Sequence, residues 1–174
     1  MGPDDDVTSG AAAVRSAAMT TPKSKTADSK PPVPKPGTPT FDSISEGDEA
    51  PPLEVGPLTR TMFVKYAGAS GDFNPMHHDD TIATQVGNPS VFGHGMLTAG
   101  LLARLLKDWF GPEALRKFQM RFSKQVWPGD TLTCSGKVVA KREDGGERLV
   151  DVELAVTNQD GVEVLSGTAT AALA

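Results

Sequence analysis

The sequence predicts an α+β fold in which one buried helix is followed by an antiparallel sheet. Leucines recur at every fourth position from Leu97 to Leu105 in the most apolar part of the chain, as in a helix that is covered on most sides. Apolar and polar side chains alternate from Val150 to Val156, as in a half-buried strand. Turn sequences separate further strands up to the C-terminus, and this pattern is typical of hairpins.

The composition excludes several classes of protein. The 174 residues carry a net charge of −5 and include one cysteine. A weakly acidic chain has no general attraction for nucleic acid, no apolar run here is long enough to span a bilayer, and one cysteine cannot form an internal disulfide. The N-terminus is acidic and lacks the apolar segment of a secretory signal. We therefore expect a cytoplasmic protein with no nucleic-acid or membrane partner.

Residues 1–45 are predicted to form a disordered tail. This stretch is rich in proline, serine and lysine, and Phe41 is its first aromatic residue. Such a segment buries too little apolar surface to offset the entropy that ordering would cost. Residues 46–174 are predicted to form a single folded domain.

The first predicted helix contains Phe63 and Tyr66 at helical spacing. Its candidate N-caps are Thr59 and Thr61, and the glycine-rich stretch 68–71 ends it. A loop then leads to the second helix.

Two more helices are predicted after that loop. A brief one, capped by Asp79 or Asp80, runs through Val86. The long apolar helix starts after the glycines at 93 and 95 and stops at Gly111-Pro112. Few charged residues interrupt its surface, so the rest of the protein must cover most of it.

Four strands are predicted in the C-terminal part. They cover residues 117–126, 132–141, 150–157 and 162–173. The turns between them fall at 128–130, 143–146 and 158–161. Since a sheet of four or five strands leaves open edges, we expect it to pair with a second subunit.

The residues best suited to chemistry lie between the first two helices. Asp72 follows a glycine, His77 comes five positions later, and Pro75 between them prevents a continuous helix. The resulting irregular loop can turn both side chains toward one point. A carboxylate and an imidazole that face the same water molecule form a competent general acid–base pair.

A second element stands at the start of the long apolar helix. The N–H groups at a helix N-terminus lack partners and lie at the positive end of the helix dipole. Gly95 has no side chain, so a ligand oxygen can approach its N–H closely, as in an oxyanion hole. Such a group would polarise a thioester carbonyl while water attacks the β carbon of a conjugated double bond.

These two elements resemble the MaoC-like family of (R)-specific enoyl-CoA hydratases and 3-hydroxyacyl-thioester dehydratases. The matching residues are Gly71-Asp72-x-Asn74-Pro75-x-His77-x-Asp79 and His94-Gly95-Met96-Leu97. The resemblance covers about residues 50–174. It implies a hot-dog fold, in which an antiparallel sheet wraps around a central helix at residues 94–109.

The resemblance also implies roles for single residues. Asp72 and His77 are expected to hold the catalytic water, and Gly95 is expected to offer its N–H to the thioester carbonyl. Asn74 matches the asparagine of the motif and is expected to organise the loop. Met96, beside Gly95, is a candidate substrate-binding residue. Neither a metal nor another cofactor is implied, because the thioester itself accepts the electrons.

The predicted activity is that of a hydro-lyase. It is the (R)-specific hydration of trans-2-enoyl thioesters, or the reverse dehydration of (R)-3-hydroxyacyl thioesters, carried on coenzyme A or acyl-carrier protein. The expected partner is a second copy or a related hot-dog subunit. Two alternatives stay open: an acyl-thioesterase of the same fold, and a non-catalytic subunit. Some family members carry a serine where this chain has Ala103, which leaves the Asp72–His77 pair intact.

Structural explanations compete for several of these residues. Asp72 taken alone could cap the short helix after it. His94 is expected to be structural and hydrogen-bonded to the backbone. Neighbouring side chains diverge, so no metal site is predicted for the run His77, His78, Asp79 and Asp80.

Overall fold

The computed structural model describes residues 37–174. The predicted tail of residues 1–45 therefore lies mostly outside the described residues. Its last part is ordered against the domain: Phe41 donates its backbone N–H to the Ala174 carbonyl over 3.0 Å, and Ile44 is buried in the core. The folded domain thus begins before the predicted boundary at residue 46.

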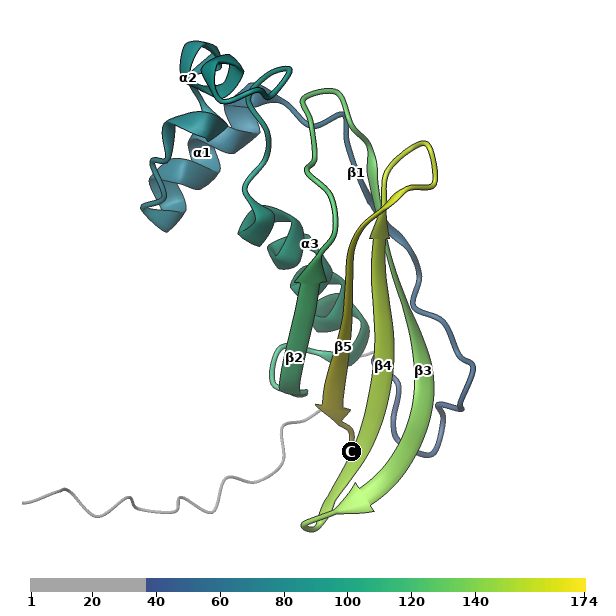
Figure 1. Cartoon of the computed structure of the whole chain (residues 1–174). Helices are drawn as coiled ribbons and strands as arrows, with labels where there is room; N and C mark the ends of the chain where they lie inside the picture. Colours follow the sequence, from purple (N-terminus) through teal and green to yellow (C-terminus); the bar gives the residue numbers. More distant parts are fainter. Residues whose placement is uncertain (1–36) are drawn as a thin grey trace, which may run out of the picture. The chain divides into compact units, whose positions relative to one another are not determined.

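All the predicted helices and strands are present, together with a short first strand that the sequence pattern did not reveal (Figure 1). The elements are β1 (Leu53–Val55), α1 (Arg60–Ser70), the 3-10 helix η1 (Pro75–His77), α2 (Asp80–Gln85), α3 (Gly95–Phe110), β2 (Leu115–Phe122), β3 (Leu132–Asp144), β4 (Glu147–Thr157) and β5 (Glu163–Ala172). Three residues are too few for β1 to show an alternating pattern. The α+β prediction is confirmed.

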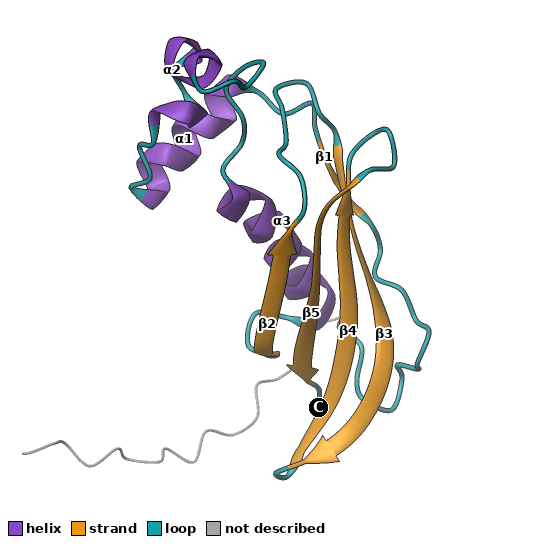
Figure 2. Ribbon diagram, in the orientation of Figure 1, coloured by secondary structure: helices purple, strands orange, loops and turns teal. Residues whose placement is uncertain are grey.

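The five strands form one antiparallel sheet in the order β1-β3-β4-β5-β2 (Figure 2). The register pairs Cys134 with Val156 and Val156 with Leu165, so these side chains share the buried face. Among the described strands, β2 pairs only with β5 and therefore forms an edge of the sheet. This open edge is the feature from which we expected a second subunit.

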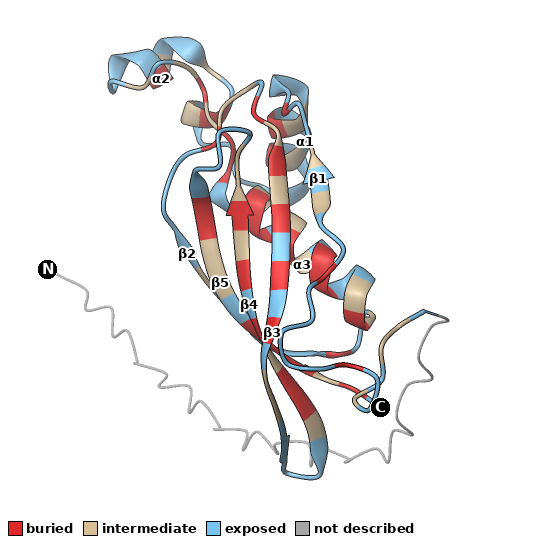
Figure 3. Ribbon diagram, turned by 90° about the vertical axis from the view of Figure 1, so that its right-hand side faces the viewer, coloured by how far each residue is buried: buried red, intermediate tan, exposed pale blue. Residues whose placement is uncertain are grey.

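Helix α3 lies along one face of the sheet, and the buried residues of both elements meet there (Figure 3). Leu102, Leu105 and Leu106 are almost fully buried in this contact. Burying such a side chain contributes about 1.5–3 kcal/mol, which makes this contact the centre of the core. In the part of the chain that the structure describes, no helix combines the length and apolarity that a bilayer crossing requires.

The helix ends decide between the predicted caps. Thr59, and not Thr61, caps α1 by accepting the N–H of Met62, and Asp79, and not Asp80, caps α2. Gly71 ends α1 in the left-handed region with φ 74°, which a side chain would disfavour. The loop with Asp72 therefore starts directly at a helix end.

Strand β2 ends at Phe122, four residues before the predicted end. The backbone N–H groups of Ser123 and Lys124 both bond to the Val164 carbonyl, so the chain leaves the regular ladder there. It continues to Val126, whose carbonyl accepts the N–H of Gly93 over 2.8 Å. The departing segment is thereby joined to the chain just before α3.

We expect Leu102→Ala to lower the free energy of unfolding by about 2–5 kcal/mol, because it opens a cavity under α3 that neighbouring side chains cannot fill. Chemical denaturation measures this change. Arg104→Ala, on the exposed face of the same helix, is the control, and it should cost less than about 1 kcal/mol. Equal losses for the two variants would contradict the central position of α3.

Candidate active site

The loop between α1 and α2 is shaped by its own side chains. Asp72 accepts the backbone N–H of Asn74 at Oδ1 over 3.2 Å, and Asn74 accepts the N–H of Met76 over 3.1 Å. Asn74 is therefore the N-cap of η1. From the sequence alone, Asp72 was a candidate for a capping role. The carboxylate of Asp72 stays exposed and available for other contacts.

His77 is held at the buried end of this loop. Its Nδ1 lies 2.8 Å from the carbonyl oxygen of Phe92, and the two rings meet edge to face with centroids 5.0 Å apart. A carbonyl oxygen only accepts hydrogen bonds, so Nδ1 carries the proton. In the neutral ring, Nε2 then has the free lone pair and can accept a proton.

The surroundings of His77 favour its neutral form. Burial is the largest influence and lowers the pKa of the imidazole, and His94 and His78 lower it further. The hydrogen bond to the Phe92 carbonyl and the charge of Asp72 act in the opposite direction. The net shift is downward, so the ring is a neutral base at neutral pH.

His94 precedes α3 as its N-cap residue. Its Nε2 lies 3.1 Å from the backbone carbonyl of Asp72, as expected of a structural histidine. The ring also stacks on His77, with centroids 3.8 Å apart and planes inclined by 29°, a contact that the sequence did not predict. One feature of the sequence could have indicated a role for His94 beyond that of a cap. It lies between two glycines at an N-cap position, where a short polar residue is usual.

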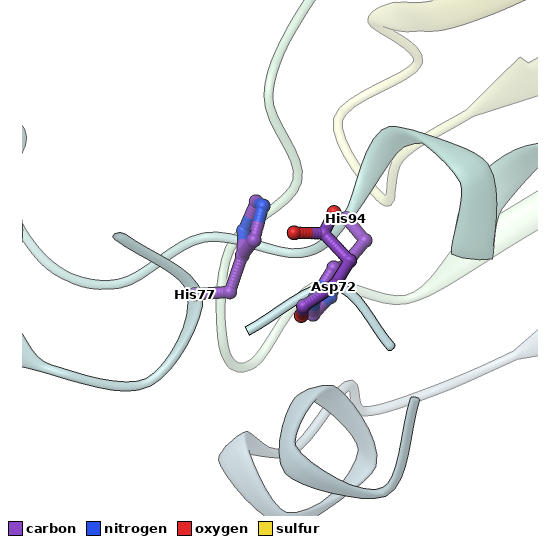
Figure 4. Close-up of side chains that lie close together, drawn as sticks. All are labelled: Asp72, His77 and His94. Atoms are coloured by element: carbon purple, nitrogen blue, oxygen red, sulfur yellow. The ribbon is translucent and has the colours of Figure 1, made fainter. Parts of the chain in front are cut away.

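Asp72, His77 and His94 thus form one cluster from segments that are distant in the sequence (Figure 4). One carboxylate oxygen and one ring nitrogen of each histidine lie within 4.8 Å of one another. Two atoms that bind the same water over about 2.8 Å each are about 4.6 Å apart at a tetrahedral angle. The spacing therefore suits a single bridging water.

The same three side chains are poorly arranged for a metal ion. A metal binds in the plane of an imidazole ring. The rings of His77 and His94 are stacked nearly parallel, so their planes run side by side and do not converge on one ion. Their neighbours are engaged elsewhere: His78 contacts the Phe73 carbonyl, and Asp79 caps α2.

Asp80 lies outside the cluster and holds the segments around it together through hydrogen bonds. Its carboxylate takes a hydrogen bond of 2.6 Å from Arg60 and another of 3.1 Å from the backbone N–H of Val91. Arg60 also donates to Ser90. These bonds tie α1 and α2 to the segment that ends in Phe92, whose carbonyl holds His77.

Gly95 opens α3 beside a cavity of about 400 Å³. As the first helical residue, it has an N–H without a partner inside the helix. A Cβ at this position would lie 3.1 Å from the ring of Phe122, which also lines the cavity, so a side chain would crowd the approach. Met96 is largely exposed and is not among the described residues that line this cavity.

Phe92 joins the cavity to the histidine cluster. It lines the cavity together with Gly95, while its carbonyl fixes His77. The structure therefore brings together the two elements that the sequence placed eighteen residues apart, counted from His77 to Gly95. Asp72, His77 and His94 themselves are not among the described residues that line the cavity.

Two curated relatives match parts of the chain. The peroxisomal hydratase-dehydrogenase-epimerase of Saccharomyces cerevisiae is 44% identical over 63 residues, which make up 36% of this chain and 7% of that protein. The 3-oxo-4,17-pregnadiene-20-carboxyl-CoA hydratase beta subunit of Mycobacterium tuberculosis is 37% identical over 81 residues, 46% of this chain and 63% of that one. In both comparisons less than two thirds of the relative is matched.

Structural likeness and a family model cover more of the chain. The (R)-hydratase from A. caviae involved in PHA biosynthesis superposes with a TM-score of 0.69 and 27% identity, over 76% of this chain and 98% of that one. The family model described as MaoC like domain matches residues 46–160, which include both motifs and the strands from β1 to β4. The chain therefore belongs to the MaoC-like family and has its hot-dog fold.

Proposed function

We propose that the protein is a hydro-lyase that adds water to trans-2-enoyl thioesters with (R) stereochemistry, or removes it from (R)-3-hydroxyacyl thioesters. One observation supports this above all. The exposed carboxylate of Asp72 and the buried, neutral ring of His77 lie at the spacing that one water can bridge. Both stand beside the helix start that carries Gly95.

In the hydration direction, the water is held between the Asp72 carboxylate and Nε2 of His77. As its oxygen bonds to C3 of the substrate, one of its protons passes to Nε2. The other proton stays hydrogen-bonded to the carboxylate, whose negative charge stabilises the imidazolium. The imidazolium then gives its proton to C2, so the pair ends in its starting protonation state.

The electrons of the double bond need an acceptor while the C3–O bond forms. They move onto the thioester oxygen and return when C2 is protonated. The N–H of Gly95, at the positive end of α3, is directed to stabilise this transient negative charge. The dehydration follows the same steps in reverse.

The proposed substrate is an acyl group on coenzyme A or on acyl-carrier protein. The cavity beside Gly95 is lined by apolar residues that include Phe122 and Val126 and by polar residues that include Lys124. Apolar walls suit an acyl or pantetheine chain, and a cationic side chain suits its phosphate. A cytoplasmic location stays a prediction.

We further propose that β2 pairs with a second hot-dog subunit, either a copy of this chain or a relative. The long open edge of β2 supports this, since unpaired backbone groups on a sheet edge favour strand addition. The relative from Mycobacterium tuberculosis is named as a beta subunit, which suits an assembly of unlike chains.

Asp72→Asn and His77→Gln should each lower turnover by about two orders of magnitude or more, because His77 carries the transferred proton and Asp72 holds the water and stabilises the imidazolium. The assay follows the absorbance of the conjugated double bond of crotonyl-CoA and of longer enoyl-CoA substrates. His78→Gln, which changes a neighbouring exposed histidine, is the control and should retain the rate.

Unchanged rates in both site variants would refute the mechanism. Release of free thiol from acyl-CoA by the wild type, without loss of the double bond, would indicate a thioesterase instead. No reaction with any enoyl thioester would favour the non-catalytic subunit.

The rate of hydration should fall on the acid side of the pH profile as His77 becomes protonated and can no longer accept a proton. Burial lowers the pKa of His77, so this fall should begin at a lower pH than an exposed histidine would give. The measurement is kcat/KM as a function of pH, which reports the ionisation of the free enzyme. A fall centred at or above the usual histidine range would contradict the assignment.

Static light scattering should give a mass of twice the 18.3 kDa of one chain if the edge of β2 pairs with a second copy. Dilution then tests how tightly the two copies associate. The mass of a single chain at all concentrations would refute self-pairing and leave an unlike subunit as the partner to seek.

A further inference from the structure

We propose that His94 is a positioning residue that joins the loop of Asp72 and His77 to the first turn of α3. Through this link it sets where the acid–base pair stands relative to the N–H of Gly95. The catalytic consequence rests on the proposed function. The structural link itself can be measured without any activity.

The first support is the set of contacts that meet on one ring. Nε2 of His94 lies 3.1 Å from the backbone carbonyl of Asp72, and one face of the ring stacks on His77 at 3.8 Å. Tyr66 of α1 approaches the same ring with centroids 5.0 Å apart. One side chain therefore contacts α1 and both ends of the loop, while its own backbone begins α3.

The second support is that the ring has almost no freedom to move. His94 is 1% exposed. On its N-terminal side, a Cβ on Gly93 would lie 2.6 Å from Val126 and 3.0 Å from Phe63, so the backbone there is pressed against the core. On its C-terminal side the helix begins at once. A ring held this firmly transmits the position of α3 to the loop.

The third support is that His94 does not act as a helix cap. The N-cap position favours serine, threonine, aspartate or asparagine, whose side chains bind the free N–H groups of the first turn. The side chain of His94 makes no such bond among the described residues and turns to the loop instead. The ring of His94 therefore contacts the loop and not the end of the helix.

The stacked arrangement also assigns the charge. The Asp72 carbonyl accepts from Nε2–H of His94, so in the neutral ring Nδ1 carries the lone pair. That atom is buried without a partner among the described residues. Two positive rings face to face at 3.8 Å would repel each other strongly. The charge formed during turnover therefore belongs on His77, next to Asp72. The other titratable neighbour of His77 is His78.

Two substitutions separate the parts of this role. His94→Phe keeps a stacking ring but removes the donor to the Asp72 carbonyl. His94→Gln keeps a donor near the place of Nε2 but removes the ring. His78→Gln is the matched control for kcat, since it removes a histidine that does not stack on His77. Because His78 also lowers the pKa of His77, this variant serves the kinetic readout and not the titration.

Three readouts are needed for each variant. NMR titration of the ring nitrogens follows the protonation of His77, enoyl-CoA hydration gives kcat and KM, and thermal unfolding reports whether the variant is folded. Both His94 variants should titrate His77 at higher pH than the wild type does, because the interaction with His94 that lowers the pKa of His77 is gone. We expect kcat to fall at least tenfold while KM changes less than about threefold.

Unchanged titration of His77 together with unchanged kcat in both folded variants would overturn the proposal and leave His94 as an ordinary core residue. If a variant does not fold, the wild type decides. Its ring-nitrogen spectrum should show the proton of His77 on Nδ1 and that of His94 on Nε2, and the opposite tautomer of His94 would refute the link.

These outcomes are distinct from a failure of the proposed function. A wild type that hydrates no enoyl thioester would remove the kinetic readout, yet the titration and the tautomers would still test the link. If the wild type is active and the His94 variants change neither kcat nor the titration of His77, only the positioning role is refuted.

Discussion

The covering of α3 by the sheet is the constraint on which the rest of the structure depends. A helix with leucines on several sides cannot remain in water, and the antiparallel strands cover one long side of it. This packing fixes the helix start, because Gly93 is bonded to Val126 and leaves no room for a side chain. The free amides at the start of α3 therefore occupy one fixed place at the end of the core.

The candidate site is assembled around that place by contacts with backbone carbonyls. The Phe92 carbonyl holds His77, and the Asp72 carbonyl holds His94. Each bond fixes the tautomer of an imidazole as well as its direction. Burial of His77 disfavours its charged form, so at neutral pH the ring is unprotonated at Nε2 and can accept a proton. The packing that places His77 in the site thus also determines its protonation state.

Local patterns were enough to predict much of this arrangement. The alternation along β4 and the leucine spacing of α3 indicated the α+β fold, since both patterns reflect burial on one side of an element. Strand β1 was missed because three residues show no period, and the end of β2 was misplaced because its last bonds depend on β5. The MaoC-like motifs pointed to Asp72, His77 and Gly95 before any contact was known.

By itself, the sequence determined which segments become helix and strand, where α1 and α2 could be capped, and which loop carries a carboxylate and an imidazole. Those properties depend on neighbours within a few residues of each other. Only the tertiary structure decided that His94 stacks on His77 and that Phe92 connects the cluster to the cavity beside Gly95. Ring stacking and burial arise between segments brought together by the packed core, so local spacing does not contain them.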